Sequence, residues 1–263
     1  MSRFCSLFSS SSGNCTYIGT ASSGILIDAG VSAKRITEAL SDRNIAPESI
    51  KAIFVTHEHS DHIKGIKVFA SRHHTPVFAT EGTILGMDNA GVLTDKFTHD
   101  VVPMSGIEVG GMFVRRFPTP HDCNESCGYT VEMPDGRKIA VATDIGHMTN
   151  EIMNSISGCD LVMIESNHDV GMLQNGIYPY YLKRRILSDV GHLCNEDCAE
   201  AVAQLVRAGT TRFYLGHLSE ENNVPLLAYR TSENALLQQG AVLGRDCFLT
   251  VNPPENFDSV LRF

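Results

Sequence analysis

The chain has 263 residues, of which 43% are hydrophobic and 19% charged, and its formal net charge is −9 at pH 7. This composition is that of a folded globular protein, and a chain of this length buries a core that needs neither disulfides nor a structural metal. The negative balance argues against a protein that coats DNA non-specifically, so a polyanionic substrate would have to be held locally, by metal ions and a few basic side chains.

The first half of the chain is rich in short strands. Residues 3–8, 16–19 and 25–29 are predicted strands joined by Ser/Gly turns. Residues 32–41 have helical periodicity, with Ser32 as the N-cap. A strand at 51–56 runs directly into a histidine-rich segment, and a helix is predicted after it at 63–71.

The rest of the chain mixes strands and helices. Strands are predicted at 77–79, 112–119, 127–133, 138–143, 161–165 and 213–216, and helices at 179–187, 196–206 and 225–238. Pro134-Asp135-Gly136 indicates a hairpin turn. No repeat or linker divides the sequence, so we expect one domain over residues 1–263. The order of elements predicts an α/β fold: a four-layer αββα sandwich of two mixed sheets with helices on the outside.

Four potential metal ligands occur within six residues in the segment His57-Glu58-His59-Ser60-Asp61-His62. His57 and His59 can turn their imidazoles toward one ion, while Asp61 and His62 can present ligands to a second. Imidazole and carboxylate suit zinc, and also manganese or iron. A solvated loop rich in histidine is the alternative, but the position between a strand and a helix favours a site for divalent metal ions.

Three further residues follow predicted strands, where ligands are well positioned: His121, Asp144 and His217. Each alone could equally be a capping or surface residue. Together with the histidine segment, they would complete two coordination shells.

The eight cysteines include two C-x3-C pairs, Cys123/Cys127 and Cys194/Cys198. A second metal site is one interpretation, but structural zinc sites mostly use other spacings, so small buried thiols are favoured. The N-terminal residues lack the apolar stretch of a signal peptide, and no run approaches a membrane span. We therefore expect a cytoplasmic protein with reduced thiols and no membrane partner.

The succession THEHSDH (56–62), PTPHD (118–122), ATDIG (142–146) and LGHLS (215–219) resembles the metallo-β-lactamase fold superfamily over nearly the whole chain. The resemblance implies two divalent ions. One would be held by His57, His59 and His121. The other would be held by Asp61, His62 and His217, with Asp144 bridging the two.

The resemblance also bears on the substrate. The common zinc β-lactamases place a cysteine where Asp144 stands, and a carboxylate bridge between close ions suits in-line attack of a metal-bridging hydroxide on a phosphodiester. Asp61 and Asp144 would orient this nucleophile. His192 resembles the extra histidine of the superfamily's nucleic-acid-processing members and is the candidate general acid. A helix-capping or buried histidine is the alternative.

Further segments resemble the small bacterial exonucleases of the YycJ/WalJ type: SSSGN (10–14), ESNHD (165–169), GIYP (176–179) with LKRR (182–185), and GHL (191–193). Cys194 departs from the serine or alanine expected there. The candidate substrate-binding residues are Ser12, Asn14, Asn167, Lys183 and Arg184. The alternative for the 10–14 segment is a tight turn between two strands. The alternative for Lys183 and Arg184 is a solvated helix face.

These resemblances imply a 5′-to-3′ DNA exonuclease. The segment between Asp144 and His192 is too short for the inserted domain of the RNA-processing β-CASP enzymes. A small-molecule phosphodiesterase, or a thioester or lactam hydrolase on the same metal site, is the second hypothesis. A binding or regulatory protein that keeps the fold without turnover is the third.

Overall fold

Fourteen strands form two seven-stranded sheets in the computed structural model, which describes residues 1–263. The first sheet has the strand order β14-β1-β2-β3-β4-β5-β6, and the second has the order β13-β12-β11-β10-β9-β8-β7. The strands of the first are β1 (Arg3–Ser10), β2 (Gly13–Gly19), β3 (Gly24–Ile27), β4 (Ile50–Phe54), β5 (Val77–Ala79), β6 (His99–Val101) and β14 (Leu261–Arg262). Those of the second are β7 (Ile107–Val109), β8 (Met112–Pro118), β9 (Cys127–Glu132), β10 (Lys138–Ala142), β11 (Leu161–Glu165), β12 (Arg212–Gly216) and β13 (Phe248–Val251).

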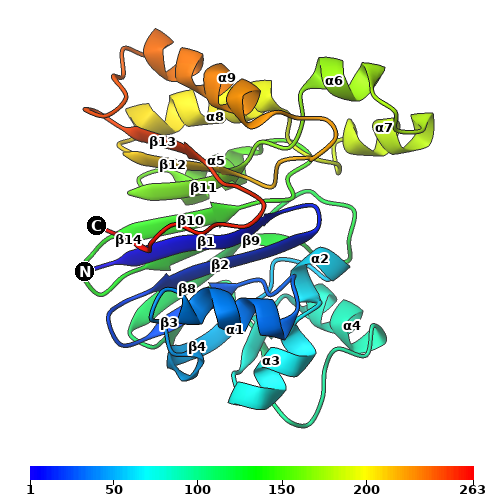
Figure 1. The fold of residues 1–263 in the computed structure, drawn as a ribbon, viewed down its shortest axis with the longest axis vertical. Helices are drawn as coiled ribbons and strands as arrows, with labels where there is room; N and C mark the ends of the chain where they lie inside the picture. The colour runs from blue at the N-terminus through cyan, green and yellow to red at the C-terminus, as the bar shows by residue number, and fades with distance from the viewer.

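Helices lie outside the two sheets. They are α1 (Ala33–Ser41), α2 (Ser60–Ile63), α3 (Ile66–His73), α4 (Glu81–Asn89), α5 (Asn150–Ile156), α6 (Val170–Asn175), α7 (Tyr180–Ile186), α8 (Asn195–Arg207) and α9 (Pro225–Gln238), with a 3₁₀ turn, η1, at Pro47–Ser49. In Figure 1, α1 and α3 cover the outer face of the first sheet, and α8 and α9 cover that of the second. None of the helices combines the length and the apolar character needed to span a membrane.

Three apolar clusters separate these four layers. One lies between the first sheet and α1 and α3, and another lies between the second sheet and α5, α8 and α9. The third lies between the sheets, where the rings of Phe54 (β4) and Tyr129 (β9) meet edge to face with centroids 5.5 Å apart. The predicted four-layer αββα sandwich is therefore confirmed. Both sheets contribute to this central cluster, and a single domain over residues 1–263 stays our prediction.

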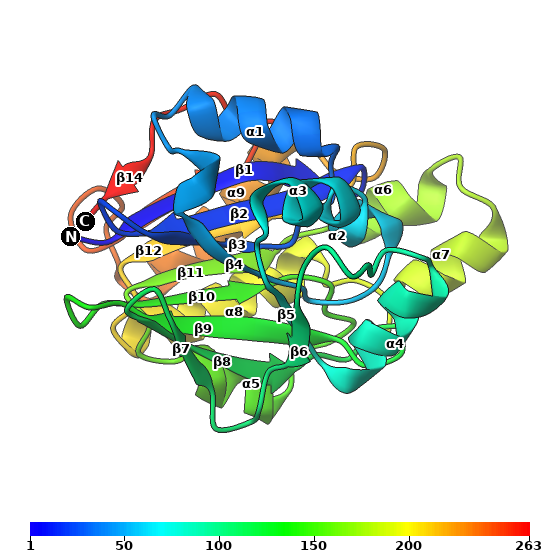
Figure 2. The same cartoon turned by 90° about the horizontal axis from the view of Figure 1, so that it is seen from below.

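Parallel pairing brings the ends of several strands to one edge of the sandwich. β3 pairs in parallel with β4, and β10, β11, β12 and β13 are parallel to one another. Loops that leave the carboxyl ends of such strands meet at the same edge of a sheet, which is where α/β proteins place their ligands. Here both sheets direct these ends to the edge that carries α2, α4, α6 and α7 (Figures 1 and 2).

Most predicted elements are confirmed, with one correction near the histidine segment. The helix expected at 63–71 is two helices, α2 and α3, interrupted at Lys64 and Gly65. Gly65 lies in this interruption and packs closely against the preceding loop, since a Cβ on it would lie 2.2 Å from the carbonyl oxygen of Val31. At α1, Ser32 is the N-cap, and its side chain accepts a hydrogen bond from the backbone N–H of Arg35. The helices α4, α5 and α6 were not predicted.

Candidate metal centre

Two groups of potential ligand atoms converge at the shared edge of the sheets. In the first, Nδ1 of His59 lies 3.0 Å from Nε2 of His57 and 3.4 Å from Nε2 of His121. In the second, Oδ2 of Asp61 lies 3.3 Å from Nε2 of His62 and 3.7 Å from Nε2 of His217. The residues come from distant parts of the chain: the loop after β4, α2, and the loops after β8 and β12.

Asp144 lies between these two groups, two residues after the end of β10. Its Oδ2 is 3.4 Å from Nε2 of His62, and its Oδ1 is 3.8 Å from Nε2 of His121. The seven residues predicted from the sequence as ligands are therefore neighbours: His57, His59, Asp61, His62, His121, Asp144 and His217.

The spacing of these atoms fits divalent metal ions. Ligand atoms roughly 2.0–2.1 Å from a tetrahedral ion lie about 3.3–3.4 Å from one another, which is close to the separations seen here. In addition, Oδ2 of Asp144 and Nε2 of His217 are buried and have no hydrogen-bond partner. Buried polar atoms normally have partners, and a bound cation would supply one for each.

The protonation of the cluster without metal follows from its charges. Burial would by itself lower the pKa of His217, but the carboxylates of Asp144, Asp61 and Glu165 outweigh it and raise the pKa to about 10. His62 behaves similarly, with Asp144 and Asp28 raising its pKa against the effect of burial. Metal ligands must be deprotonated, so a cation that binds here displaces these protons, and its affinity falls as the pH falls.

His57, Asp61 and Asp144 are already in the protonation state that binds a metal ion. Burial and the neighbouring histidines lower the pKa of His57, which keeps this imidazole neutral. Burial would raise the pKa values of Asp61 and Asp144, but the surrounding histidines lower both below their usual range. Neutral imidazoles and ionised carboxylates are the forms that bind divalent ions.

The backbone is strained at three positions around this cluster. Asp28, Asp144 and His217 adopt left-handed conformations, with φ of 63°, 57° and 54°. Each residue follows the end of a strand, and a non-glycine residue in this region costs about 1–3 kcal/mol. The left-handed turn directs each side chain back over the strand ends, toward the cluster.

Gly30 allows the loop after β3 to pack against α2. A Cβ at this position would lie 1.6 Å from the carbonyl oxygen of Asp61, which is backbone and cannot move aside as a flexible side chain would. We expect Gly30→Ala to displace Asp61, to lower the free energy of unfolding by about 1–3 kcal/mol or more, and to reduce metal content. Thermal unfolding and metal analysis would measure the two effects. Gly171→Ala, at an exposed position of α6, is the control, and equal behaviour of the two variants would contradict the expectation.

Two carboxylates that position the ligands were missed by the sequence analysis. Oδ2 of Asp28 lies 2.8 Å from Nδ1 of His62, and Oδ1 accepts a hydrogen bond from the backbone N–H of Thr56. Glu165 is fully buried, and its Oε1 accepts from Nδ1 of His217 at 2.7 Å and from Nδ1 of His192 at 2.9 Å. Such acceptors fix the tautomer and the orientation of a ligating imidazole. In the sequence, each carboxylate closes or directly follows an apolar strand, and Glu165 also begins the ESNHD segment (165–169).

His192 lies beside the two ligand groups. Its ring centroid is 5.0 Å from that of His121 and 5.3 Å from that of His217. The side chain is 14% exposed, whereas those of His121 and His217 are almost fully buried. Because Nδ1 donates its proton to Glu165, Nε2 is the nitrogen that remains available to exchange a proton with a substrate.

The five predicted substrate-binding residues do not share one position relative to the ligand cluster. Asn14 contacts the cluster, with Nδ2 3.1 Å from Nε2 of His62. Asn167 is buried and donates to the backbone carbonyl of His217, so it supports the loop that carries this ligand. Ser12 lies at the exposed tip of the β1–β2 hairpin, where its hydroxyl donates to Glu220. The 10–14 segment is therefore a tight turn between strands.

The basic residues of α7 have separate roles. Nζ of Lys183 donates to the carbonyl oxygens of Gln174 and Gly176, which closes the α6–α7 connection. Arg184 is exposed. The neighbouring Arg185, which was not among the predicted site residues, forms an ion pair with Asp122, and Oδ1 of Asp122 lies 3.4 Å from Nε2 of His121.

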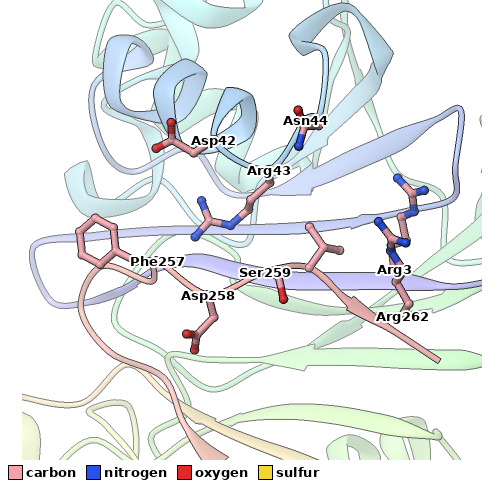
Figure 3. A pocket seen from close by; sticks show the side chains of 9 residues that line it. Arg3, Asp42, Arg43, Asn44, Phe257, Asp258, Ser259 and Arg262 are labelled. Carbon is pink, nitrogen blue, oxygen red and sulfur yellow. The ribbon is translucent and has the colours of Figure 1, made fainter.

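A hollow of about 550 Å³ lies away from this cluster and is lined by Arg3, Arg43 and Arg262 together with Asp42 and Asp258 (Figure 3). It is at the start of β1 and the end of α1, whereas the ligands lie near the opposite ends of both elements. The hollow therefore belongs to the far side of the sandwich.

The cysteines take no part in the cluster. The groups of three or more converging ligand-type residues contain only histidine, aspartate and glutamate. Six of the eight thiols are buried, which favours the interpretation as small core residues. Cys194 is the N-cap of α8, and its sulfur accepts a hydrogen bond from the backbone N–H of Asp197.

Comparison with known proteins assigns this chain to a family. The family model for the beta-lactamase superfamily domain matches residues 24–218. The chain therefore belongs to the β-lactamase superfamily. Within this superfamily, it belongs to the same family as two exodeoxyribonucleases. Exodeoxyribonuclease WalJ of Streptococcus pneumoniae serotype 2 is 38% identical over 247 residues, 93% of this chain and 91% of that protein. Exodeoxyribonuclease YycJ of Bacillus anthracis is 39% identical over 245 residues, 92% of each.

A solved structure supports the fold. The metallo-β-lactamase fold protein YhfI from Bacillus subtilis matches with a TM-score of 0.72 at 12% sequence identity, over 97% of this chain and 98% of that one. At this identity the likeness concerns the fold alone.

Proposed function

We propose that the protein is a metal-dependent exodeoxyribonuclease that hydrolyses phosphodiester bonds from the 5′ end of DNA. The observation that carries the proposal is the meeting of two ligand groups at a buried carboxylate, Asp144, beside a histidine that is free to exchange a proton. The two relatives named as exodeoxyribonucleases, each matching more than 90% of the chain, support DNA as the substrate. The eight free thiols fit an enzyme of the cytoplasm.

The residues present fit two divalent ions such as Zn²⁺, Mn²⁺ or Fe²⁺. His57, His59 and His121 would hold one, and Asp61, His62 and His217 would hold the other, with Asp144 shared between them. When bound, such a pair of ions lowers the pKa of water and neutralises charge that develops on a phosphate.

The chain's own residues supply positioning and proton transfer. Asp28 and Glu165 hold the rings of His62 and His217 in fixed tautomers, so little reorganisation accompanies the reaction. Asp61 and Asp144 orient the attacking water toward phosphorus. As the bond from phosphorus to the leaving oxygen breaks, Nε2 of His192 donates a proton to that oxygen.

Digestion of end-labelled DNA tests this function. Purified protein is first analysed for metal, and then metal-stripped samples are reloaded with Zn²⁺, Mn²⁺ or Fe²⁺. We expect DNA labelled at the 5′ end to release its label in short products at the first time points, while 3′-labelled DNA shortens progressively. Cyclic nucleotides, thioesters and nitrocefin serve as comparison substrates. Turnover of one of these, with no cleavage of DNA under any metal, would contradict the proposal.

A further inference from the structure

The connection between α6 and α7 and the first turn of α7 expose large apolar and aromatic side chains beside the metal centre. Ile177 is 86% exposed, Tyr180 76% and Tyr181 75%. In both ribbon views, α6 and α7 project from the edge of the sandwich that carries α2 and α4 (Figures 1 and 2). Neighbouring exposed side chains of this size characterise surfaces that bind another molecule.

Cationic groups accompany these aromatic rings. The guanidinium carbon of Arg184 lies 6.0 Å from the ring centroid of Tyr180, and both side chains are exposed. Arg185 continues the positive charge toward the cluster, where a nitrogen of its guanidinium lies 2.7 Å from Oδ1 of Asp122. The helix therefore connects an exposed aromatic surface to the metal centre through Asp122 and His121.

The interleaving of rings and cations indicates the kind of ligand. Aromatic side chains stack on nucleobases of any sequence, and nearby cations follow the phosphate backbone. In a duplex the base faces are covered by their neighbours, so only unpaired nucleotides offer faces to an exposed tyrosine. The positive charge of α7 also contrasts with the chain's net charge of −9, which makes this a local site for an anionic ligand.

We propose that Tyr180, Tyr181 and Arg184 form a platform on which unpaired nucleotides of a DNA end stack while the strand enters the metal centre. This inference rests on the proposed function and adds that the enzyme prefers single-stranded ends. Lys183 contributes to the platform indirectly, because its bonds to Gln174 and Gly176 hold the α6–α7 connection in place.

Equilibrium binding tests the platform independently of cleavage. Metal-loaded protein is titrated into a fluorescent phosphorothioate oligothymidylate, which resists hydrolysis. We expect Tyr180→Ala and Tyr181→Ala each to weaken binding by about tenfold, because base–aromatic stacking contributes about 1–3 kcal/mol per base. Tyr180→Phe keeps the ring and should bind within about twofold of the wild type. Phe257→Ala, which removes an 82% exposed ring on the far side, is the matched control and should have no effect.

Kinetics separate this inference from the proposed function. The tyrosine variants should lose kcat/KM on single-stranded DNA while hydrolysing bis(p-nitrophenyl) phosphate, which carries no nucleobase, at the wild-type rate. Unchanged oligonucleotide binding in both alanine variants, or equal losses on DNA and on the small ester, would overturn the platform. A wild type that cleaves no DNA would instead refute the proposed function. If the tyrosine variants convert a dimer to a monomer in sedimentation, the surface is an interface between copies of this chain and the platform is refuted.

Discussion

Asp144→Asn should reduce hydrolysis by about 1000-fold and lower the metal content below that of the wild type. Asp144 is the one carboxylate that approaches both ligand groups, with Oδ2 3.4 Å from His62 and Oδ1 3.8 Å from His121. The neutral amide cannot compensate the positive charge of two ions. Metal ions stabilise the charge of the transition state by several kcal/mol, and each 1.4 kcal/mol corresponds to a tenfold change in rate. Elemental analysis and initial rates on single-stranded DNA would measure the two losses.

The control for this variant is Asp160→Asn. Asp160 precedes β11 at the opposite edge of the sheets, where it forms a half-exposed ion pair with Arg137 and accepts a hydrogen bond from the backbone N–H of Lys138. Loss of such a pair changes stability by less than about 1 kcal/mol. Activity of Asp144→Asn within tenfold of the wild type, with full metal content, would show that Asp144 is not shared between two ions.

The convergence of the candidate ligands could be predicted because of where these residues stand in the chain. His121, Asp144 and His217 each follow a strand, and the segment from His57 to His62 follows β4. Parallel strands bring their carboxyl ends to one edge, so residues at these positions meet whatever the length of the connections between them. The same regular patterns of strand and helix predicted the four layers.

The supporting residues were not predictable in the same way. Asp28 and Glu165 resemble ordinary strand-end carboxylates until the fold places His62 and His217 within hydrogen-bond distance. Arg185 could not be separated from Lys183 and Arg184 by sequence, because their directions depend on the rotation of α7. At the break between α2 and α3, Gly65 likewise packs against Val31, a contact between residues distant in sequence.

His192→Ala should slow the hydrolysis of DNA by about 100- to 10,000-fold, the usual range for loss of a general acid, and should leave metal content unchanged. Nδ1 of His192 is held by Glu165, so the ring presents Nε2 to the substrate rather than to an ion. An alkoxide leaving group needs a proton as its bond to phosphorus breaks. Nitrophenolate leaves without one, so the same variant should hydrolyse bis(p-nitrophenyl) phosphate within about tenfold of the wild-type rate.

The leaving-group comparison distinguishes two roles for His192. Nδ1 of His192 also lies near Asp144 and His217, in a group of four residues that could hold a cation themselves. If His192 bound metal, its removal would lower metal content and slow both substrates alike, and the assignment as an acid would be wrong. His99→Ala, which removes an exposed histidine from β6, controls for the change in charge. If His192 is a general acid, the loss of rate in His192→Ala should increase with the basicity of the leaving group. Only a poor leaving group depends on the proton that His192 supplies.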